Sequence, residues 1–175
     1  MASGAPKLTN RYKSDIAIQG DRICQIGDLG REKARQTIDA GGKIVAPGFV
    51  DVHNHSDAWL LKIPHLLPKT TQGFTTEVIM ADGISYAPVD ARTRHHWTYY
   101  LRALNGLQLR EDEGWESLAD YMGLIEGRSA QNAITHIPYA NLRTMACGWG
   151  RLVPDDVQIQ EILAGVEAGM AAGVV

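Results

Sequence analysis

The segment PGFVDVHNHSD at residues 47–57 places a short apolar run directly before a His-x-His pair. A Pro-Gly pair interrupts the chain just before the run, so a buried strand is expected over residues 49–55. Because side chains alternate along a strand, His53 and His55 would point to the same side, with bases roughly 6.5–7 Å apart. Two half-exposed histidines without a metal are the alternative. However, Asp51 shares their side, and three ionisable groups on one side of a buried strand need compensation, usually by a metal ion.

Further along the chain, strand-like and helix-like patterns alternate. Strands are expected over residues 49–55, 77–81 and 132–137, and helices over 91–104, 117–126 and from 154 to Gly173. Ser117 and Asp120 have the spacing of a capping box. Val174 and Val175 would begin another strand. This alternation predicts right-handed βα crossovers and a parallel sheet.

The first 46 residues have the pattern of a small β module. Ile16 and Ile18 alternate with polar residues, a turn is expected at 19–21, and a second strand is expected over 23–26. A further strand pair is expected at residues 37–38 and 43–45, on either side of an Ala-Gly-Gly turn.

Several motifs resemble those of one enzyme family. Residues 46–57 resemble the first-strand motif of the amidohydrolase superfamily of metal-dependent (β/α)8-barrel hydrolases. QGFTT at 72–76 and ADGISYAP at 81–88 resemble segments of the N-acyl-D-amino-acid deacylase branch, and NLR at 141–143 continues the likeness. The resemblance implies an α/β fold. A small β-sandwich segment over residues 1–46 would precede a partial (β/α)8 TIM barrel over residues 47–175.

Asp82 is the third candidate ligand. It follows an apolar run and precedes Gly83, which places it at the C-terminal end of a strand, where barrel enzymes carry their reactive groups. The deacylase branch commonly has a cysteine ligand at this position, and a carboxylate oxygen can replace a thiolate with similar reach. The alternative is a simple Asp-Gly turn. The family histidine of the next strand corresponds to Tyr139, so His136 is not expected to be a ligand.

The resemblance implies a zinc-dependent hydrolase that cleaves amide bonds of N-acyl-D-amino acids through metal-bound hydroxide, with His53, His55 and Asp82 as ligands. Cyclic amides of the dihydroorotase or hydantoinase type are the alternative substrates. A full barrel takes about 250 residues, and this chain has 175. The chain is therefore expected to be an N-terminal fragment whose general base lies beyond Val175.

A second hypothesis is a chain without hydrolase activity, either an inactive remnant or a subunit that completes its barrel with another chain. An open barrel exposes strand edges, so self-association is expected. The 17 basic and 20 acidic residues give a net charge of −3. The basic residues are scattered, which argues against nucleic acid as a partner. No segment approaches the roughly 18 apolar residues of a membrane span, and no secretory pattern opens the chain, so a cytoplasmic location is expected.

Overall fold

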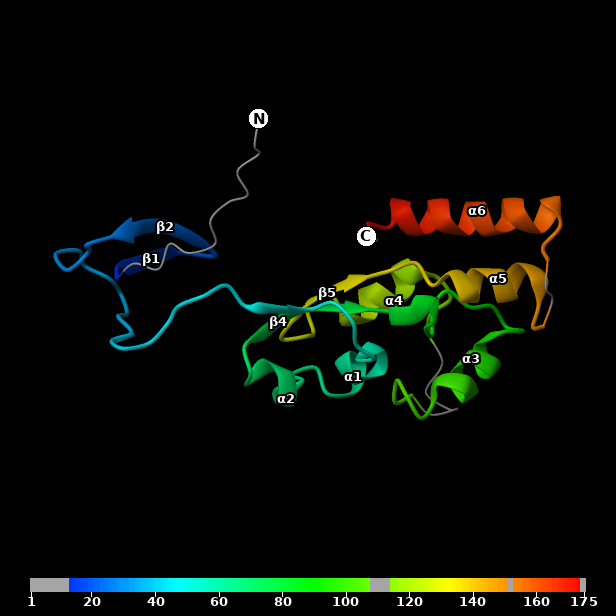
Figure 1. Ribbon diagram of the computed structural model, residues 1–175, viewed down its shortest axis with the longest axis horizontal. Coiled ribbons are helices and arrows are strands. Elements are labelled where there is room, and N and C mark those ends of the chain that lie inside the picture. The colour runs from blue at the N-terminus through cyan, green and yellow to red at the C-terminus, as the bar shows by residue number, and fades with distance from the viewer. Residues whose placement is uncertain (1–12, 108–113, 151–152, 174–175) are drawn as a thin grey trace, which may run out of the picture. The chain divides into compact units, whose positions relative to one another are not determined.

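The computed structural model describes residues 13–107, 114–150 and 153–173. The chain divides into two compact units, Met1–Val45 and Ala46–Val175. In the first unit, β1 (Asp15–Gln19) and β2 (Arg22–Gly27) pair in an antiparallel hairpin (Figure 1). Gly20 has a φ of 64° at the turn, a conformation that glycine adopts without steric cost. The predicted hairpin is therefore confirmed.

The second predicted strand pair of this unit is wrong. Residues 37–38 and 43–45 form no strand, although a turn does close between them through the Lys43 N–H and the Ala40 carbonyl, at 2.9 Å. Ile38, Ile44 and Val45 are all well exposed. Strand formation is stabilised mainly by side chains packing on one face of a sheet, and these side chains have no such face to cover.

The second unit contains a parallel three-stranded sheet in the order β3–β4–β5, which confirms the predicted parallel arrangement. The strands are β3 (Phe49–Asp51), β4 (Phe74–Ile79) and β5 (Asn132–Thr135). Strand β3 is shorter than predicted, because it ends at Asp51 and leaves His53 and His55 in the following loop. The Asn54 side chain donates a hydrogen bond to the Val78 carbonyl at 3.1 Å. This bond connects the loop to β4 beyond the last backbone pairing between β3 and β4.

Six α-helices and one 3₁₀ turn lie in the described part of this unit. They are α1 (Asp57–Lys62), α2 (Leu67–Thr70), η1 (Ala81–Gly83), α3 (Arg94–Leu101), α4 (Leu118–Ile125), α5 (Tyr139–Cys147) and α6 (Asp156–Ala171). Helices α3, α4 and α6 were predicted, and the capping box of Ser117 and Asp120 is confirmed. Helices α1, α2 and α5 were not predicted. The strand expected at residues 174–175 lies outside the described residues.

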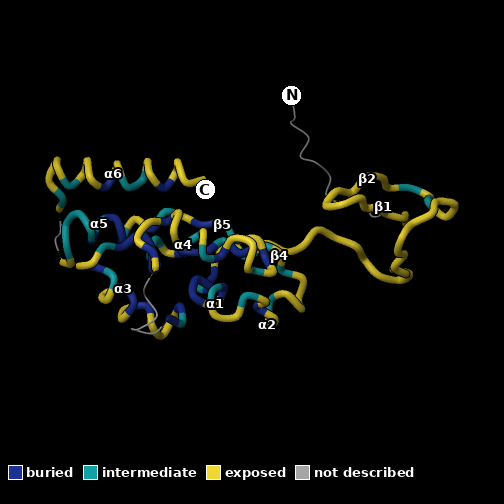
Figure 2. Tube along the Cα trace, turned by 180° about the vertical axis from the view of Figure 1, so that it is seen from behind, coloured by how far each residue is buried: buried dark blue, intermediate teal, exposed yellow. Residues whose placement is uncertain are grey.

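The core of the second unit lies between the sheet and helices α1, α3 and α4 (Figure 2). Ile79 of β4, Leu60 of α1 and Leu101 of α3 are almost fully buried, as is Tyr121 of α4. Trp115 packs edge-on against Tyr121, with ring centroids 5.2 Å apart. The aromatic residues in the middle of the chain are therefore partly core residues.

Helix α6 packs closely on α5 and is otherwise mostly exposed (Figures 1 and 2). A Cβ at Gly165 would lie 2.4 Å from Leu142 Cδ2, and one at Gly169 would lie 2.9 Å from Ile137 Cδ1. Glycine at these two positions therefore permits the close approach. In the described segments, no helix has both the length and the apolar character that crossing a bilayer requires.

Candidate metal centre

Three side chains converge at the carboxyl ends of β3 and β4. The Nε2 atom of His53 lies 3.4 Å from Asp82 Oδ1, and Nε2 of His55 lies 3.5 Å from Asp82 Oδ2. The two imidazole centroids are 6.1 Å apart. One ligand atom from each of the three residues lies within 4.8 Å of the other two, and this is the one such group of three found in the described residues.

The loop that carries the two histidines is ordered by the residue between them. Asn54 is buried, and its Nδ2 donates to the Asp51 carbonyl at 3.2 Å and to the Val78 carbonyl at 3.1 Å. Its Oδ1 accepts the N–H of Ser56 at 3.0 Å. Asn54 thus points into the protein while its neighbours meet Asp82. The predicted His-x-His alternation holds in this loop, although the strand has already ended.

Asp82 reaches the histidines because the chain turns sharply after β4. Met80, Asp82 and Gly83 all have positive φ, of 63°, 61° and 71°. Aspartate tolerates this conformation better than most residues, and glycine adopts it freely. Met80 is buried in the same conformation, which is uncommon for a long side chain and costs conformational energy. This turn aims the Asp82 carboxylate at the histidines.

The donor set suits a divalent transition metal. Imidazole nitrogen and carboxylate oxygen are both ordinary zinc ligands, and two histidines with one carboxylate match a common catalytic set. The side chains of His53 and Asp82 are 65% and 52% exposed, whereas that of His55 is 23% exposed. A bound ion would therefore keep a face open to solvent, as a catalytic site requires.

A buried carboxylate, Asp57, lies two residues after His55. Burial raises the pKa of Asp57 above its ordinary value, and the hydrogen bond from Ser85 and the charge interaction with His55 offset this only in part. Ser85 Oγ donates to Asp57 Oδ1. Among the described residues, Asp57 Oδ2 and His55 Nδ1 are buried and have no hydrogen-bond partner. The contact between Ser85 and Asp57 was not predicted from the sequence.

Asp51, the last residue of β3, belongs to a second charged group, which lies just before the histidine loop. Lys69 Nζ contacts Asp51 Oδ2 at 2.7 Å and also pairs with Glu77, which is fully buried and is the register partner of Asp51. Burial pushes the pKa of Asp51 upward, but the Lys69 charge and hydrogen bond and the His53 N–H outweigh it, so the pKa lies below its ordinary value. Lys69 therefore compensates Asp51, which sequence reasoning had grouped with the metal site. The sequence feature that could have predicted this charged group is Glu77, a glutamate within the apolar strand β4.

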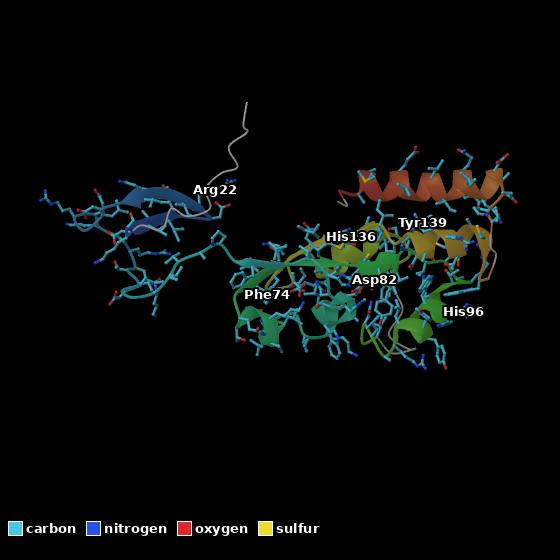
Figure 3. All side chains as sticks on the ribbon, in the orientation of Figure 1. Arg22, Phe74, Asp82, His96, His136 and Tyr139 are labelled. Atoms are coloured by element: carbon cyan, nitrogen blue, oxygen red, sulfur yellow. The ribbon has the colours of Figure 1, made fainter. Side chains whose placement is uncertain are left out.

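His136 and Tyr139 lie on the segment that leads from β5 into α5 (Figure 3). Both are exposed, and neither belongs to the three-residue cluster. The other described histidines, at 65, 95 and 96, are also exposed and outside it.

The comparisons with known proteins relate the chain to one family. Residues 36–113 match the profile of the amidohydrolase family. Over these residues, and in the likeness to solved structures described next, the chain is similar to the amidohydrolase family.

The similar proteins include deacylases. The chain is 39% identical to an N-acyl-D-glutamate deacylase of Alcaligenes xylosoxydans over 137 residues, which covers 78% of this chain and 27% of the relative. It is 32% identical to a D-aminoacylase of the same organism over 167 residues, which covers 93% of this chain and 33% of the relative. A solved N-acyl-D-glutamate deacylase of Bordetella bronchiseptica, in complex with zinc and a phosphonate inhibitor, matches with a TM-score of 0.79. It is 30% identical, and the match covers 93% of this chain and 33% of that one. The chain thus spans about a third of the length of these relatives or less.

Proposed function

We propose that this chain contributes the His53, His55 and Asp82 ligands of a zinc site to a hydrolase that cleaves carbon–nitrogen bonds in non-peptide amides. The convergence of three ligand atoms within 4.8 Å is the observation that carries the proposal. Asn54 fixes the loop between the histidines, so the donors are already close together before an ion binds. Zinc is the favoured ion because the donors are two imidazoles and one carboxylate.

The three side chains would have distinct roles. His53 and His55 bind as neutral imidazoles, so they must lose any proton before they take the ion. Asp82 supplies the negative charge that partly balances a divalent cation. When bound, the ion would lower the pKa of a water and polarise the substrate carbonyl. The exposed side of His53 and Asp82 leaves room for water and substrate to reach the site.

The deacylase relatives favour N-acyl-D-amino acids as the substrates. The solved N-acyl-D-glutamate deacylase binds a phosphonate inhibitor that mimics the tetrahedral intermediate of its reaction, which suits hydrolysis of an acyl–nitrogen bond. A cyclic amide substrate and a catalytically inactive chain were the alternatives, and no observation on the described residues favours either of them over deacylation.

We infer that the parallel sheet β3–β4–β5 belongs to a (β/α)8 barrel of the amidohydrolase type over residues 47–175, with a small β-sandwich segment over residues 1–46. The parallel register and the helices that alternate with the strands support the barrel. The β1–β2 hairpin supports the β character of the smaller segment. The likeness to the solved deacylase, at a TM-score of 0.79, supports a fold shared with that enzyme.

The metal content of the purified chain is the first test. We expect about one equivalent of zinc per chain by elemental mass spectrometry, and its loss in a His53→Ala, His55→Ala double variant. The matched control is a His65→Ala, His95→Ala variant, which removes two exposed histidines outside the cluster. Zinc that is retained without His53 and His55 would contradict the proposed ligands.

The substrate proposal needs a separate assay on the longest form of the protein that can be expressed. Hydrolysis of an N-acetyl-D-amino acid, with the L enantiomer as the comparison, should release the free amino acid only while zinc is bound. Hydrolysis that is unchanged after chelation would show that the metal is not required.

A further inference from the structure

Three buried polar residues join the elements that surround the candidate metal centre. Asp57 is the first residue of α1 and follows the histidine loop, Ser85 lies three residues after Asp82, and Asn141 lies in the first turn of α5. All three are fully buried. They come from the segments that follow β3, β4 and β5, so a contact among them links the carboxyl ends of all three strands.

The contacts among these residues are specific. Ser85 Oγ donates to Asp57 Oδ1. The Asn141 side chain makes two hydrogen bonds to the backbone of Ser85. Its Oδ1 accepts the Ser85 N–H at 3.0 Å, and its Nδ2 donates to the Ser85 carbonyl at 2.7 Å. The same Nδ2 also donates to the Pro88 carbonyl at 3.1 Å. The segment 85–88 is therefore held by a side chain of another element.

Packing alone does not account for this set. A carboxylate, a hydroxyl and an amide in a buried position cost desolvation free energy, and apolar side chains of similar volume would fill the space without that cost. Asp57 lies two residues after His55, so it belongs to the same short segment as that proposed ligand. Histidine ligands of metals commonly depend on an outer carboxylate or carbonyl for their orientation, and loss of such partners weakens metal binding.

We propose that Asp57, Ser85 and Asn141 are positioning residues of the metal centre. None of the three would contact the ion. Their hydrogen bonds fix the turn that carries Asp82 relative to the loop that carries His53 and His55, so that the three ligand atoms stay within reach of one ion. This inference rests on the proposed metal site and adds three residues that lie outside the ligand cluster.

The test is zinc affinity measured by competition with a chromophoric chelator on the full chain. Ser85→Ala removes the donor to Asp57 and leaves the Ser85 backbone bonds to Asn141 in place. We expect zinc to bind about tenfold or more weakly, as for other outer contacts of metal sites. The matched control is Ser117→Ala, which also removes one serine hydroxyl bond, at the start of α4, and should leave zinc affinity unchanged.

A second variant and a spectroscopic signature separate positioning from general stability. Asn141→Asp keeps the acceptor for the Ser85 N–H and removes the two donors to carbonyl groups. With Co²⁺ in place of zinc, the visible absorption band of either variant should shift in position or intensity relative to wild type. The cobalt spectrum of Ser117→Ala should match wild type.

The outcomes distinguish a failure of the positioning role from a failure of the proposed metal site. A wild-type chain that binds no zinc overturns the proposed site and this inference with it. A wild-type chain that binds zinc, together with a Ser85→Ala variant of equal affinity and unchanged cobalt spectrum, overturns the positioning role alone. Equal weakening in Ser85→Ala and Ser117→Ala would assign the effect to stability and would also overturn the positioning role.

Discussion

Asp82 combines an uncommon backbone conformation with a side chain that meets two histidines. Its φ of 61° is one that aspartate tolerates, and Gly83 directly after it continues the turn. A cysteine commonly occupies this position in the deacylases that the chain resembles. The carboxylate is a harder donor than a thiolate. This chain should therefore accept oxygen-preferring metals more readily than a protein with cysteine at this position.

The Asp82 carboxylate is expected to be needed for metal affinity. Asp82→Asn keeps the size of the side chain and its tolerance of positive φ, but it removes the negative charge between the histidines. Zinc should bind about tenfold or more weakly, because a direct ligand counts for at least as much as an outer contact. A competition titration measures this, with Asp21→Asn in the exposed hairpin turn as the control. Equal affinity in the Asp82 variant would show that the carboxylate is not a ligand.

Replacing Asp82 by cysteine should change metal preference more than affinity. The thiolate is a softer ligand, so Asp82→Cys should favour zinc over Mn²⁺ more strongly than wild type does. The measurement is the ratio of the two dissociation constants in each protein. An unchanged ratio would contradict direct coordination by residue 82.

Lys69 is expected to be essential for stability because it neutralises a fully buried glutamate. Lys69→Met leaves Glu77 without its cation, and breaking a buried ion pair on one side costs about 3–5 kcal/mol. Urea unfolding followed by circular dichroism measures this loss.

Two further variants test the reason for that loss. Adding Glu77→Gln to Lys69→Met should restore part of the stability, because the uncompensated charge is removed. Lys33→Met, at an exposed position, should have little effect. A Lys69→Met variant as stable as wild type would show that Glu77 needs no counter-charge.

The sequence was informative about single residues where their chemistry and spacing are local. His53, His55 and Asp82 could be selected because each is an ionisable residue at or just after an apolar run. Asp57, Ser85 and Asn141 could not be linked in this way, because their contacts join positions 28 and 56 residues apart. A single sequence does not show that the Ser85 hydroxyl will bond a buried carboxylate 28 residues away.

At the scale of elements, the hairpin, the parallel strands and the helices with strong caps were foreseen. Ser117 and Asp155 both begin helices through capping boxes. Helices α1 and α2 were missed because they have only six and four residues. Helix α5 has nine residues and was missed because no side-chain cap marks where it begins. The strand pair at residues 37–38 and 43–45 was expected from β-branched residues on either side of an Ala-Gly-Gly turn. Such residues do not form a strand without a surface to cover.

The segment before α3 should make stability depend on acid pH. Burial pushes the pKa of Asp90 upward, but hydrogen bonds from Arg92 and Thr93 outweigh it, so the folded pKa lies below the ordinary value. The folded state then binds fewer protons than the unfolded state. This contribution is complete above about pH 5 and is lost as the pH falls below about 4 through the folded pKa.

Asp90→Asn is the variant that tests this dependence. It should lower the free energy of unfolding by about 1–2 kcal/mol near neutral pH, since hydrogen bonds to a charged group are lost. The difference in stability between about pH 7 and pH 3 should shrink in the variant, as measured by urea unfolding at each pH. Asp21→Asn should leave that difference unchanged.

At the scale of the whole molecule, the sheet presents an apolar outer strand. Strand β3 lies at one edge of the described sheet, and Phe49, Val50 and Val52 on or next to it are about half exposed or more. An outer strand of this kind offers unpaired backbone groups to another chain. The relatives are about three times as long as this chain or longer, so in them further residues are available to cover such a surface.

The 175-residue chain is therefore expected to self-associate. Light scattering after size exclusion should show a mass that rises with concentration. Val50→Lys should lower that mass, because a lysine on an outer strand opposes pairing with another chain. Val157→Lys, which places the same charge on the exposed side of α6, is the control. A monomer at every concentration would contradict this expectation.

The buried Asn54 also bears on how fast an ion would enter and leave. Its three hydrogen bonds hold the histidine loop in place, and the side chain of His53 is still 65% exposed. The donors are already in position on an open face, so binding of an ion requires no segment of the chain to close over it. Uptake should then be limited by the loss of water from the ion, so that the site loads quickly, and a chelator can reach the bound ion from the open face.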